Sequence, residues 1–452
     1  MTFRLTWARP EDLVPHALDA AARDGADVEA VRRRWIAAGR DDRPDREGAG
    51  TPGTPDQRRL ARTLLDDLDA LPRDLALLAA EPDGLDAIPD LPLLPVGDDL
   101  ADRVHGAWLG RAAGCLLGKP VEKLPREGIA AIAEATGNLP VRAYFTAVGL
   151  PDAIAERWPW NRRSRPTSLA ERIDGMPEDD DLNFPLIVLH LLEQTDGDPT
   201  TDDVATRWLN ELPGGRVFTA ERIAYRNLLD GGEPDEAAVV GNPFTDWIGA
   251  QIRTDVYGWA RPGDRTAAAR LAWADARLSH RRNGLFGALF AAACASAAVV
   301  LDDPRAVLEA GLEVVPPESR YAAAVRFGLA TAEAAGSDDA GLDALHERYG
   351  DLHWVHVLNN AALLAFAVAR GDGDFARTTG LAVECGWDTD SVGATAGAIV
   401  GALGGLGAVP PSFADPIHDR LATSVPGEDG ARLSALADRT LALVPQRSAS
   451  RG

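Results

Sequence analysis

Glycine recurs at every fourth position in two separate apolar segments of the chain. The first segment runs from Gly106 to Gly118 and the second from Gly393 to Gly401. Residues four apart lie on the same face of an α-helix, so each segment predicts a helix with bare backbone along one side. Such a strip lets a neighbouring helix approach closely. We therefore expect two core helices, each seated tightly against another backbone.

Two uncharged stretches, Gly284 to Leu301 and Val392 to Phe413, are long enough to span a membrane. Both are built mainly from Ala and Gly, and the second includes the run Val409-Pro410-Pro411. Their transfer into lipid would gain little free energy. We interpret both as core helices and expect no membrane partner.

Helical patterns fill most of the remaining chain. From Ala101 onward, segments rich in Ala and Leu alternate with polar loops, and runs of alternating β-branched residues are few. The predicted fold class is therefore all-α. Residues 1–97 read as an N-terminal helical accessory region, interrupted by a charged Gly/Pro/Thr connection at 41–55. Residues 98–452 read as the main domain.

The net charge of -23 disfavours non-specific binding to nucleic acid and to anionic lipid. An anionic substrate must then be held locally, by metal or by a few arginines. The three cysteines lie in apolar or Gly/Ala-rich stretches without zinc-ligand spacing. They suggest buried thiols in a reducing cytoplasm, and residues 1–19 lack the apolar core of an export signal.

Two acidic clusters lie far apart in the chain, Glu178–Asp181 and Asp388–Ser391, and each opens a predicted helix. In the first, Pro185 is expected within the first helical turn, where proline is tolerated. Carboxylates gathered at a helix start repel one another, and the helix dipole offsets only a fraction of a charge. Capping explains either cluster alone. The two together favour an oxygen-ligand site for two hard divalent cations.

Further residues elsewhere in the chain are candidates for the same site. Glu122 follows a Gly-Lys-Pro break, where its carboxylate could swing into a site or lie in solvent. Asp275 and Ser279 share a helix face at the end of an Ala-rich segment. His280 comes next, although a lone histidine is more often structural than catalytic.

Five segments, taken in chain order, carry a family resemblance. Residues 106–122 are similar to a glycine-rich first helix and its following glutamate, and Asp179–Leu182 stands in place of Thr-Asp-Asp-Thr. Residues 249–253 resemble a Gly-Ala-Ala-Met-Arg substrate loop. Asp275–His280 and Asp388–Ser391 look like Asp-Ala-x-x-Thr-His and Asp-Thr-Asp-Thr. Together they resemble the ADP-ribosylglycohydrolase family, which includes the dinitrogenase-reductase-activating glycohydrolases.

The resemblance implies a compact orthogonal bundle of α-helices around two Mg²⁺ or Mn²⁺ ions. The metal ligands that it implies are Asp179, Asp180, Asp181, Asp388, Asp390 and Ser391. The implied catalytic carboxylates are Glu122, Asp181 and Asp390, and the implied substrate-binding residues are Gly249, Arg253, Asp275 and His280. Asp179, Leu182 and Ile248 stand where the family commonly has Thr, Thr and Asn. We therefore expect metal binding to be kept and substrate choice to differ.

The activity implied is hydrolysis at the anomeric carbon of an ADP-ribosyl or related ribosyl group. Two cations about 3.5 to 4 Å apart would fix the ribose hydroxyls and acidify a water, whose proton a carboxylate takes. Arg253, Arg281 and Arg282 are candidates to meet the pyrophosphate, although surface charge is the commoner role of any one arginine. The substrate is an ADP-ribosylated or ribosylated protein or small molecule.

Several alternatives stay open on the sequence alone. The same site would suit an N-glycoside hydrolase acting on a small nucleoside-like metabolite, or a family member that binds ADP-ribose without turnover. A terpenoid synthase would read Asp179-Asp180 as a diphosphate motif, but Asn183 and the lack of a downstream Asn/Ser/Glu triad disfavour it. A haloacid-dehalogenase-type phosphatase would use Asp388 and Asp390, but needs a buried strand before them.

Overall fold

The computed structural model describes residues 5–445 and is built from helices joined by loops. Within that part of the chain there is no strand, apart from isolated bridges between single residues. The predicted all-α class is confirmed. No helix in this range is long and apolar enough to cross a membrane.

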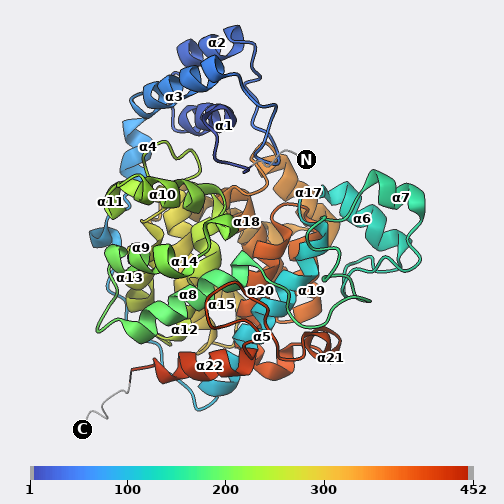
Figure 1. The fold of residues 1–452 in the computed structure, drawn as a ribbon. Coiled ribbons are helices and arrows are strands. Elements are labelled where there is room, and N and C mark those ends of the chain that lie inside the picture. The colour runs from blue at the N-terminus through green and yellow to red at the C-terminus, as the bar shows by residue number, and fades with distance from the viewer. Residues whose placement is uncertain (1–4, 446–452) are drawn as a thin grey trace.

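The helices fall into an N-terminal group and a larger main body (Figure 1). The first group comprises α1 (Pro10–Arg23), α2 (Glu29–Ala37), α3 (Pro55–Asp69), α4 (Leu75–Ala80) and the 3-10 helix η1 (Leu85–Ala87). The body begins with α5 (Leu100–Gly118), η2 (Lys119–Val121), α6 (Arg126–Ala135), α7 (Asp152–Arg157), α8 (Asp180–Gln194), α9 (Thr201–Glu211), η3 (Gly214–Arg216), α10 (Thr219–Leu229), α11 (Pro234–Ala237), η4 (Ile248–Arg253), α12 (Asp255–Trp259) and α13 (Arg265–Ala276). It continues with α14 (Arg282–Ala298), α15 (Pro304–Leu312), α16 (Arg320–Ala334), α17 (Asp338–Tyr349), α18 (Val357–Gly371), α19 (Phe375–Glu384), α20 (Thr389–Gly404), η5 (Leu406–Ala408), α21 (Pro411–Ala414), η6 (Asp415–Ile417) and α22 (Leu433–Ala442).

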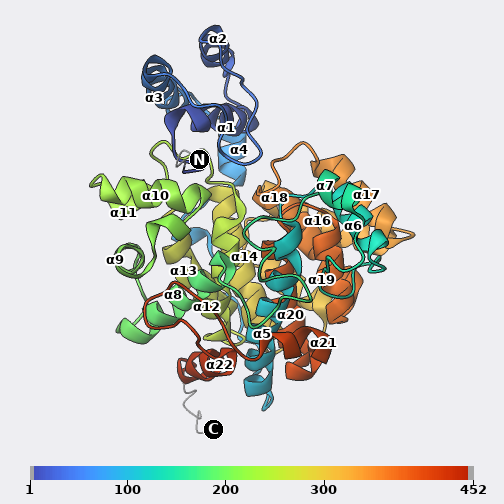
Figure 2. The ribbon, with the colours of Figure 1, turned by 45° about the vertical axis from the view of Figure 1, so that its right-hand side comes forward.

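The two glycine strips pack against each other, a pairing that the four-residue repeats alone do not specify. Helices α5 and α20 lie side by side in the middle of the body (Figures 1 and 2). A Cβ atom placed on Gly110 would lie 2.2 Å from the carbonyl oxygen of Gly397, and one on Gly114 would lie 2.0 Å from that of Gly393. At the C-terminal end of α5, Thr389 donates its hydroxyl hydrogen to the Gly118 carbonyl at 2.9 Å. Backbone therefore meets backbone along this seam, and its register is fixed.

The predicted helical pattern of the N-terminal region is also found. Helices α1, α2 and α3 form a cluster at one end of the molecule, and α4 leads from it along the body (Figure 1). The charged connection at 41–55 is irregular up to Thr54, where α3 is capped by that hydroxyl.

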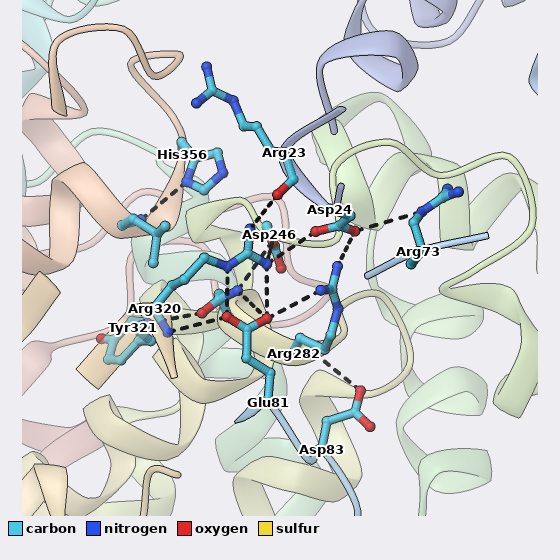
Figure 3. A network of polar contacts seen from close by, with 12 residues as sticks. Arg23, Asp24, Arg73, Glu81, Asp83, Asp246, Arg282, Arg320, Tyr321 and His356 are labelled. Atoms are coloured by element: carbon cyan, nitrogen blue, oxygen red, sulfur yellow. Dashed lines mark hydrogen bonds and ion pairs between the residues drawn. The ribbon is translucent and has the colours of Figure 1, made fainter. Parts of the chain in front are cut away.

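A buried group of ion pairs joins this region to the body (Figure 3). Glu81, 2 % exposed, accepts hydrogen bonds from Arg320 at 2.7 Å and from Arg282 at 3.2 Å. Asp24 at the end of α1 accepts from the same two arginines. Burial would raise the pKa of Glu81, but the arginines outweigh it and hold the pKa below its usual value. Removing either partner would leave a buried charge unpaired, so we expect such a change to weaken the docking.

A histidine on α1 makes the docking sensitive to acid. His16 is 4 % exposed, and its ring lies 5.1 Å from that of Phe244 and 5.4 Å from that of Trp247, between centroids. Burial lowers the pKa of His16 to about 3. The unfolded chain therefore binds a proton near pH 6.5 that the folded chain does not, and stability falls as pH drops below that value.

We expect His16→Phe to remove this part of the acid sensitivity. Between pH 8 and pH 5 the histidine costs the wild type about 2 kcal/mol in free energy of unfolding. The variant should lose correspondingly less over that interval, measured by urea denaturation at both pH values. The partly exposed His105, replaced in the same way, is the control. Equal losses in wild type and His16→Phe would contradict the prediction.

Candidate metal and substrate site

A cavity of about 1120 Å³ opens beside the N-terminal ends of α8 and α20. Both predicted acidic clusters reach it. Its lining includes the carboxyl residues Glu122, Asp179, Asp180, Asp388 and Asp390, together with Lys119 and Ser391. Segments about 200 residues apart in the chain are thus brought to one place, as a two-cluster site requires.

The first cluster is fixed by the start of α8. Asp179 caps the helix: its Oδ1 accepts from the Asp181 amide at 2.9 Å, while its Oδ2 is paired with the Lys119 ammonium. Burial would raise the pKa of Asp179, but the charge and hydrogen bond of Lys119 outweigh it and lower the pKa overall. Asp179 is therefore ionised at neutral pH.

The expectation that Pro185 lies in the first turn is wrong, because α8 begins at Asp180 and Pro185 lies inside it. Proline has no N–H, so the Asp181 carbonyl four residues earlier loses its helical donor. Arg111 replaces it, donating from Nε to that carbonyl at 2.8 Å. The sequence analysis missed Arg111, a fully buried charge in the glycine-rich helix α5 that also pairs with Asp255. An arginine placed between the glycines at 110 and 114, in the apolar part of the helix, was the available signal.

Asp181 lies deeper than its neighbours and ties the two clusters together. It is 1 % exposed, accepts the Ser391 hydroxyl at 3.3 Å and lies 3.4 Å from Arg111 Nη2. Ligand atoms of Cys115, Asp179 and Asp181 lie within 4.8 Å of one another. Burial, and then the nearby aspartates, raise the pKa of the Cys115 thiol well above its usual value. Because thiolate is the form that binds metal, the group offers carboxylate oxygen rather than sulfur.

The second cluster places crowded carboxyl groups in a buried position. Asp388 caps α20 without a side-chain hydrogen bond to the helix, and Asp390 follows in its first turn. The Oδ1 atom of Asp390 is buried and has no hydrogen-bond partner within residues 5–445. Burial, and then repulsion from the other carboxylates, raise the pKa values of Asp180, Asp388 and Asp390. An orphaned buried oxygen among crowded carboxylates fits a hard divalent cation.

Glu122 is held in a different protonation state. It directly follows η2, and its Oε2 accepts a hydrogen bond from Asn161. Burial, and then the charge of Asp390, raise the pKa of Glu122 to about 8. At neutral pH this carboxyl group therefore keeps its proton, whereas Asp179 has lost its own.

Comparison with known proteins decides the family. The family model described as ADP-ribosylglycohydrolase matches residues 97–450. The chain belongs to the ADP-ribosylglycohydrolase family. An uncharacterized protein of Archaeoglobus fulgidus is 26 % identical over 324 residues, which cover 71 % of this chain and 93 % of the relative. A solved structure titled "ADP-ribosylglycohydrolase-related protein complex" is 23 % identical with a TM-score of 0.40, covering 77 % of this chain and 100 % of that one.

In this member of the family, the residues expected to bind substrate lie at two depths from the cavity. Gly249 lines the cavity, and a Cβ atom there would lie 2.2 Å from a Glu221 oxygen. Arg253 is fully buried behind it, with Glu221 at 2.6 Å and Asp275 at 2.5 Å. His280, also fully buried, shares Ser279 with Arg253. Their contacts hold the 3-10 helix η4 in place, and Arg253 is not among the residues that line the cavity.

Other arginines reach the cavity instead. Arg281 donates to backbone carbonyls, Arg282 belongs to the ion pairs of Figure 3, and neither lines the cavity. The arginines that line the cavity are Arg162, Arg163, Arg172, Arg216 and Arg420. The run of arginines at 162–165, before the first acidic cluster, was a visible signal for Arg162 and Arg163. Arg420, far along the chain, carried none.

Proposed function

We propose that this protein hydrolyses the glycosidic bond of an ADP-ribosyl or related ribosyl group with the help of divalent cations. Family membership supports glycohydrolase chemistry. The observation that carries the proposal is the meeting of both acidic clusters in one cavity, with Asp390 Oδ1 left unpartnered. We further propose residues 98–452 as the catalytic domain and residues 1–97 as its helical accessory region.

The oxygens available to cations come from two helix starts. Asp179, Asp180, Asp388, Asp390 and Ser391 line the cavity, and Asp181 supports Ser391 from behind. When bound, Mg²⁺ or Mn²⁺ would supply positive charge at the ribose hydroxyls and at the attacking water. Asp181 holds Ser391, and Lys119 holds Asp179, so the two pairs stay oriented without the substrate.

The carboxyl groups divide the proton work between them. Glu122 keeps its proton at neutral pH, because its pKa is about 8, and so suits the general acid that protonates the leaving group. A carboxylate of the aspartate set suits the base that takes the water's proton, and Asp390 offers a buried Oδ1 atom without a hydrogen-bond partner in the described chain. Arginines on the loops of the cavity suit the phosphate oxygens of the ADP part.

Removing divalent cations is expected to stop turnover. The purified protein, incubated with ADP-ribosyl-arginine, ADP-ribosyl-serine or NAD, should release free ADP-ribose in Mg²⁺ or Mn²⁺ and fall to background in chelator. Restoring the cation should restore the rate and raise the melting temperature, because ligand at about 100 times its Kd stabilises the folded state by about 2.7 kcal/mol.

Chelator already saturated with Mg²⁺ is the control for this experiment. Turnover that continued undiminished in free chelator would contradict the metal mechanism. The substrate that is cleaved identifies the leaving group. Cation-dependent binding of ADP-ribose without release from any substrate would instead indicate a binding protein.

A further inference from the structure

The N-terminal region contributes to the wall of the cavity, although it lies before the family match. Thr6, Trp7 and Glu47 all line the cavity that holds the acidic clusters. Thr6 is held from the body by Arg222 of α10, which donates to its hydroxyl oxygen at 3.1 Å. The wall of the substrate site is therefore composite, with one part supplied by the family domain and one by this region.

Trp7 is fixed by the irregular connection between α2 and α3. Its amide donates to the Gly48 carbonyl at 2.7 Å, and a Cβ atom on Gly48 would lie 2.1 Å from the indole ring. Gly48 has φ +71°, so glycine is favoured there for conformation as well as for space. The indole nitrogen of Trp7 is buried with no hydrogen-bond partner in the described chain. What Trp7 offers to the cavity is therefore its ring rather than its N–H.

The ammonium group of Lys123 lies near the ring of Trp7. Its ammonium lies 5.9 Å from the ring centroid of Trp7 and 6.0 Å from that of Trp354, within the range of cation–π attraction. The same ammonium lies 3.9 Å from Oε1 of Glu122. The two tryptophans thus hold the charge of Lys123 beside the carboxyl group that we assign as general acid.

Arg46 contacts the backbone of Lys123 and also the side chain of Trp354. It donates to the Lys123 carbonyl at 2.9 Å, and the Trp354 indole donates to the Arg46 carbonyl at 2.9 Å. Lys123 itself has φ +74°, a conformation that a side-chain-bearing residue holds only when its surroundings impose it. That conformation belongs to a turn that the Leu124 amide closes by donating to the Val121 carbonyl at 2.9 Å, and Arg46 bonds the carbonyl of Lys123 in this turn.

We propose that the N-terminal region is a positioning cap of the active site, in which Trp7 and Arg46 hold Lys123 against Glu122 at the cavity wall. Lys123 lines the cavity, where its ammonium group would suit an anionic ligand group, the phosphate oxygens of a ribosyl phosphate. Trp7 is then a positioning residue that acts through Lys123. The inference rests on the proposed function, because it concerns the same cavity.

A double-mutant cycle tests this on the full-length protein. Trp7→Ala, Lys123→Met and the double variant are compared for kcat, KM and free energy of unfolding. If Trp7 acts through Lys123, each single change raises KM roughly two- to fivefold, the range expected of a partly exposed cation–π pair, and the double variant equals Lys123→Met. Trp7→Phe keeps an aromatic ring and should recover most of the loss.

Trp273→Ala is the matched control. Trp273 is a half-buried tryptophan of α13 whose indole donates to the Asp83 carbonyl of the N-terminal region at 2.8 Å, away from the cavity lining. It weakens docking without touching Lys123, so its KM should match the wild type. A raised KM in this control, or effects of Trp7→Ala and Lys123→Met that simply add, would overturn the proposal.

Failure of the proposed function is distinguishable from failure of the cap. If the wild type releases no ADP-ribose from any substrate, the same variants are compared by their affinity for ADP-ribose in the presence of Mg²⁺, measured by calorimetry. Coupling between Trp7 and Lys123 in that affinity supports the cap even though turnover is absent. Additive or absent effects on affinity overturn it.

Discussion

Gly110→Ala is expected to lower the free energy of unfolding by about 2 kcal/mol or more, despite adding a better helix former. Alanine gains about 0.5–1 kcal/mol over glycine inside a helix. Here the new methyl group would lie 2.2 Å from the Gly397 carbonyl oxygen and 2.9 Å from its carbon. The obstacle is backbone on a neighbouring core helix, so it cannot rotate away. The steric cost therefore outweighs the gain in propensity.

Thermal and urea denaturation measure this loss. The control is Gly336→Ala, in the loop between α16 and α17, where a Cβ atom would meet nothing within 4 Å. That variant should stay within about 0.5 kcal/mol of the wild type, as surface changes usually do. If Gly110→Ala were as stable as Gly336→Ala, the close seam between α5 and α20 would be wrong.

Asp390→Asn should lower turnover by about 10²- to 10⁴-fold, the range typical of losing an acid–base group. The same substitution should make the metal-free protein more stable. The pKa of Asp390 is raised in the folded state, first by burial and then by Asp179. A group with a raised folded pKa destabilises the fold once pH exceeds its unfolded value, so the neutral amide should raise the melting temperature in chelator at pH 7.

The sign of the metal response separates this prediction from simple misfolding. Wild type should gain stability on adding Mg²⁺, whereas Asp390→Asn should gain much less. Asp303→Asn is the matched control, because Asp303 caps α15 through the Arg305 amide at 2.9 Å and asparagine caps equally well. An Asp390→Asn protein with wild-type turnover and wild-type response to Mg²⁺ would exclude that residue from the site.

Local patterns in the sequence predicted most of the fold. The region predicted to be helical at residues 1–97 contains α1 to α4, and the glycine segment from Gly106 lies within α5. Both glycine strips and both acidic clusters were visible, because helix spacing and helix starts are local properties. The pairing of the two strips was not visible, because a four-residue repeat does not specify which helix it packs against. Only the close approach of Gly110 to Gly397 reveals it.

The roles of single charged residues were harder to predict. Arg253 belongs to a motif that suggests substrate contact, yet it is fully buried between Glu221 and Asp275. Arg111 was overlooked although it carries the first acidic cluster through the Asp181 carbonyl. In both cases burial decides the role, and burial depends on neighbours distant in the chain. The contact of Arg46 with Lys123 is of the same kind.

The close packing of α5 against α20 fixes the distance between the candidate site residues that adjoin the two helices. Glu122 follows α5 by a few residues, and Asp388 to Ser391 begin α20, so sliding one helix by a single turn would separate these groups by about 5.4 Å. Backbone-to-backbone contact leaves no room for such a slip. Changes of substrate preference in this chain are therefore expected from the loops and the N-terminal region around the cavity, while the helix packing keeps Glu122 and the aspartates at a constant spacing.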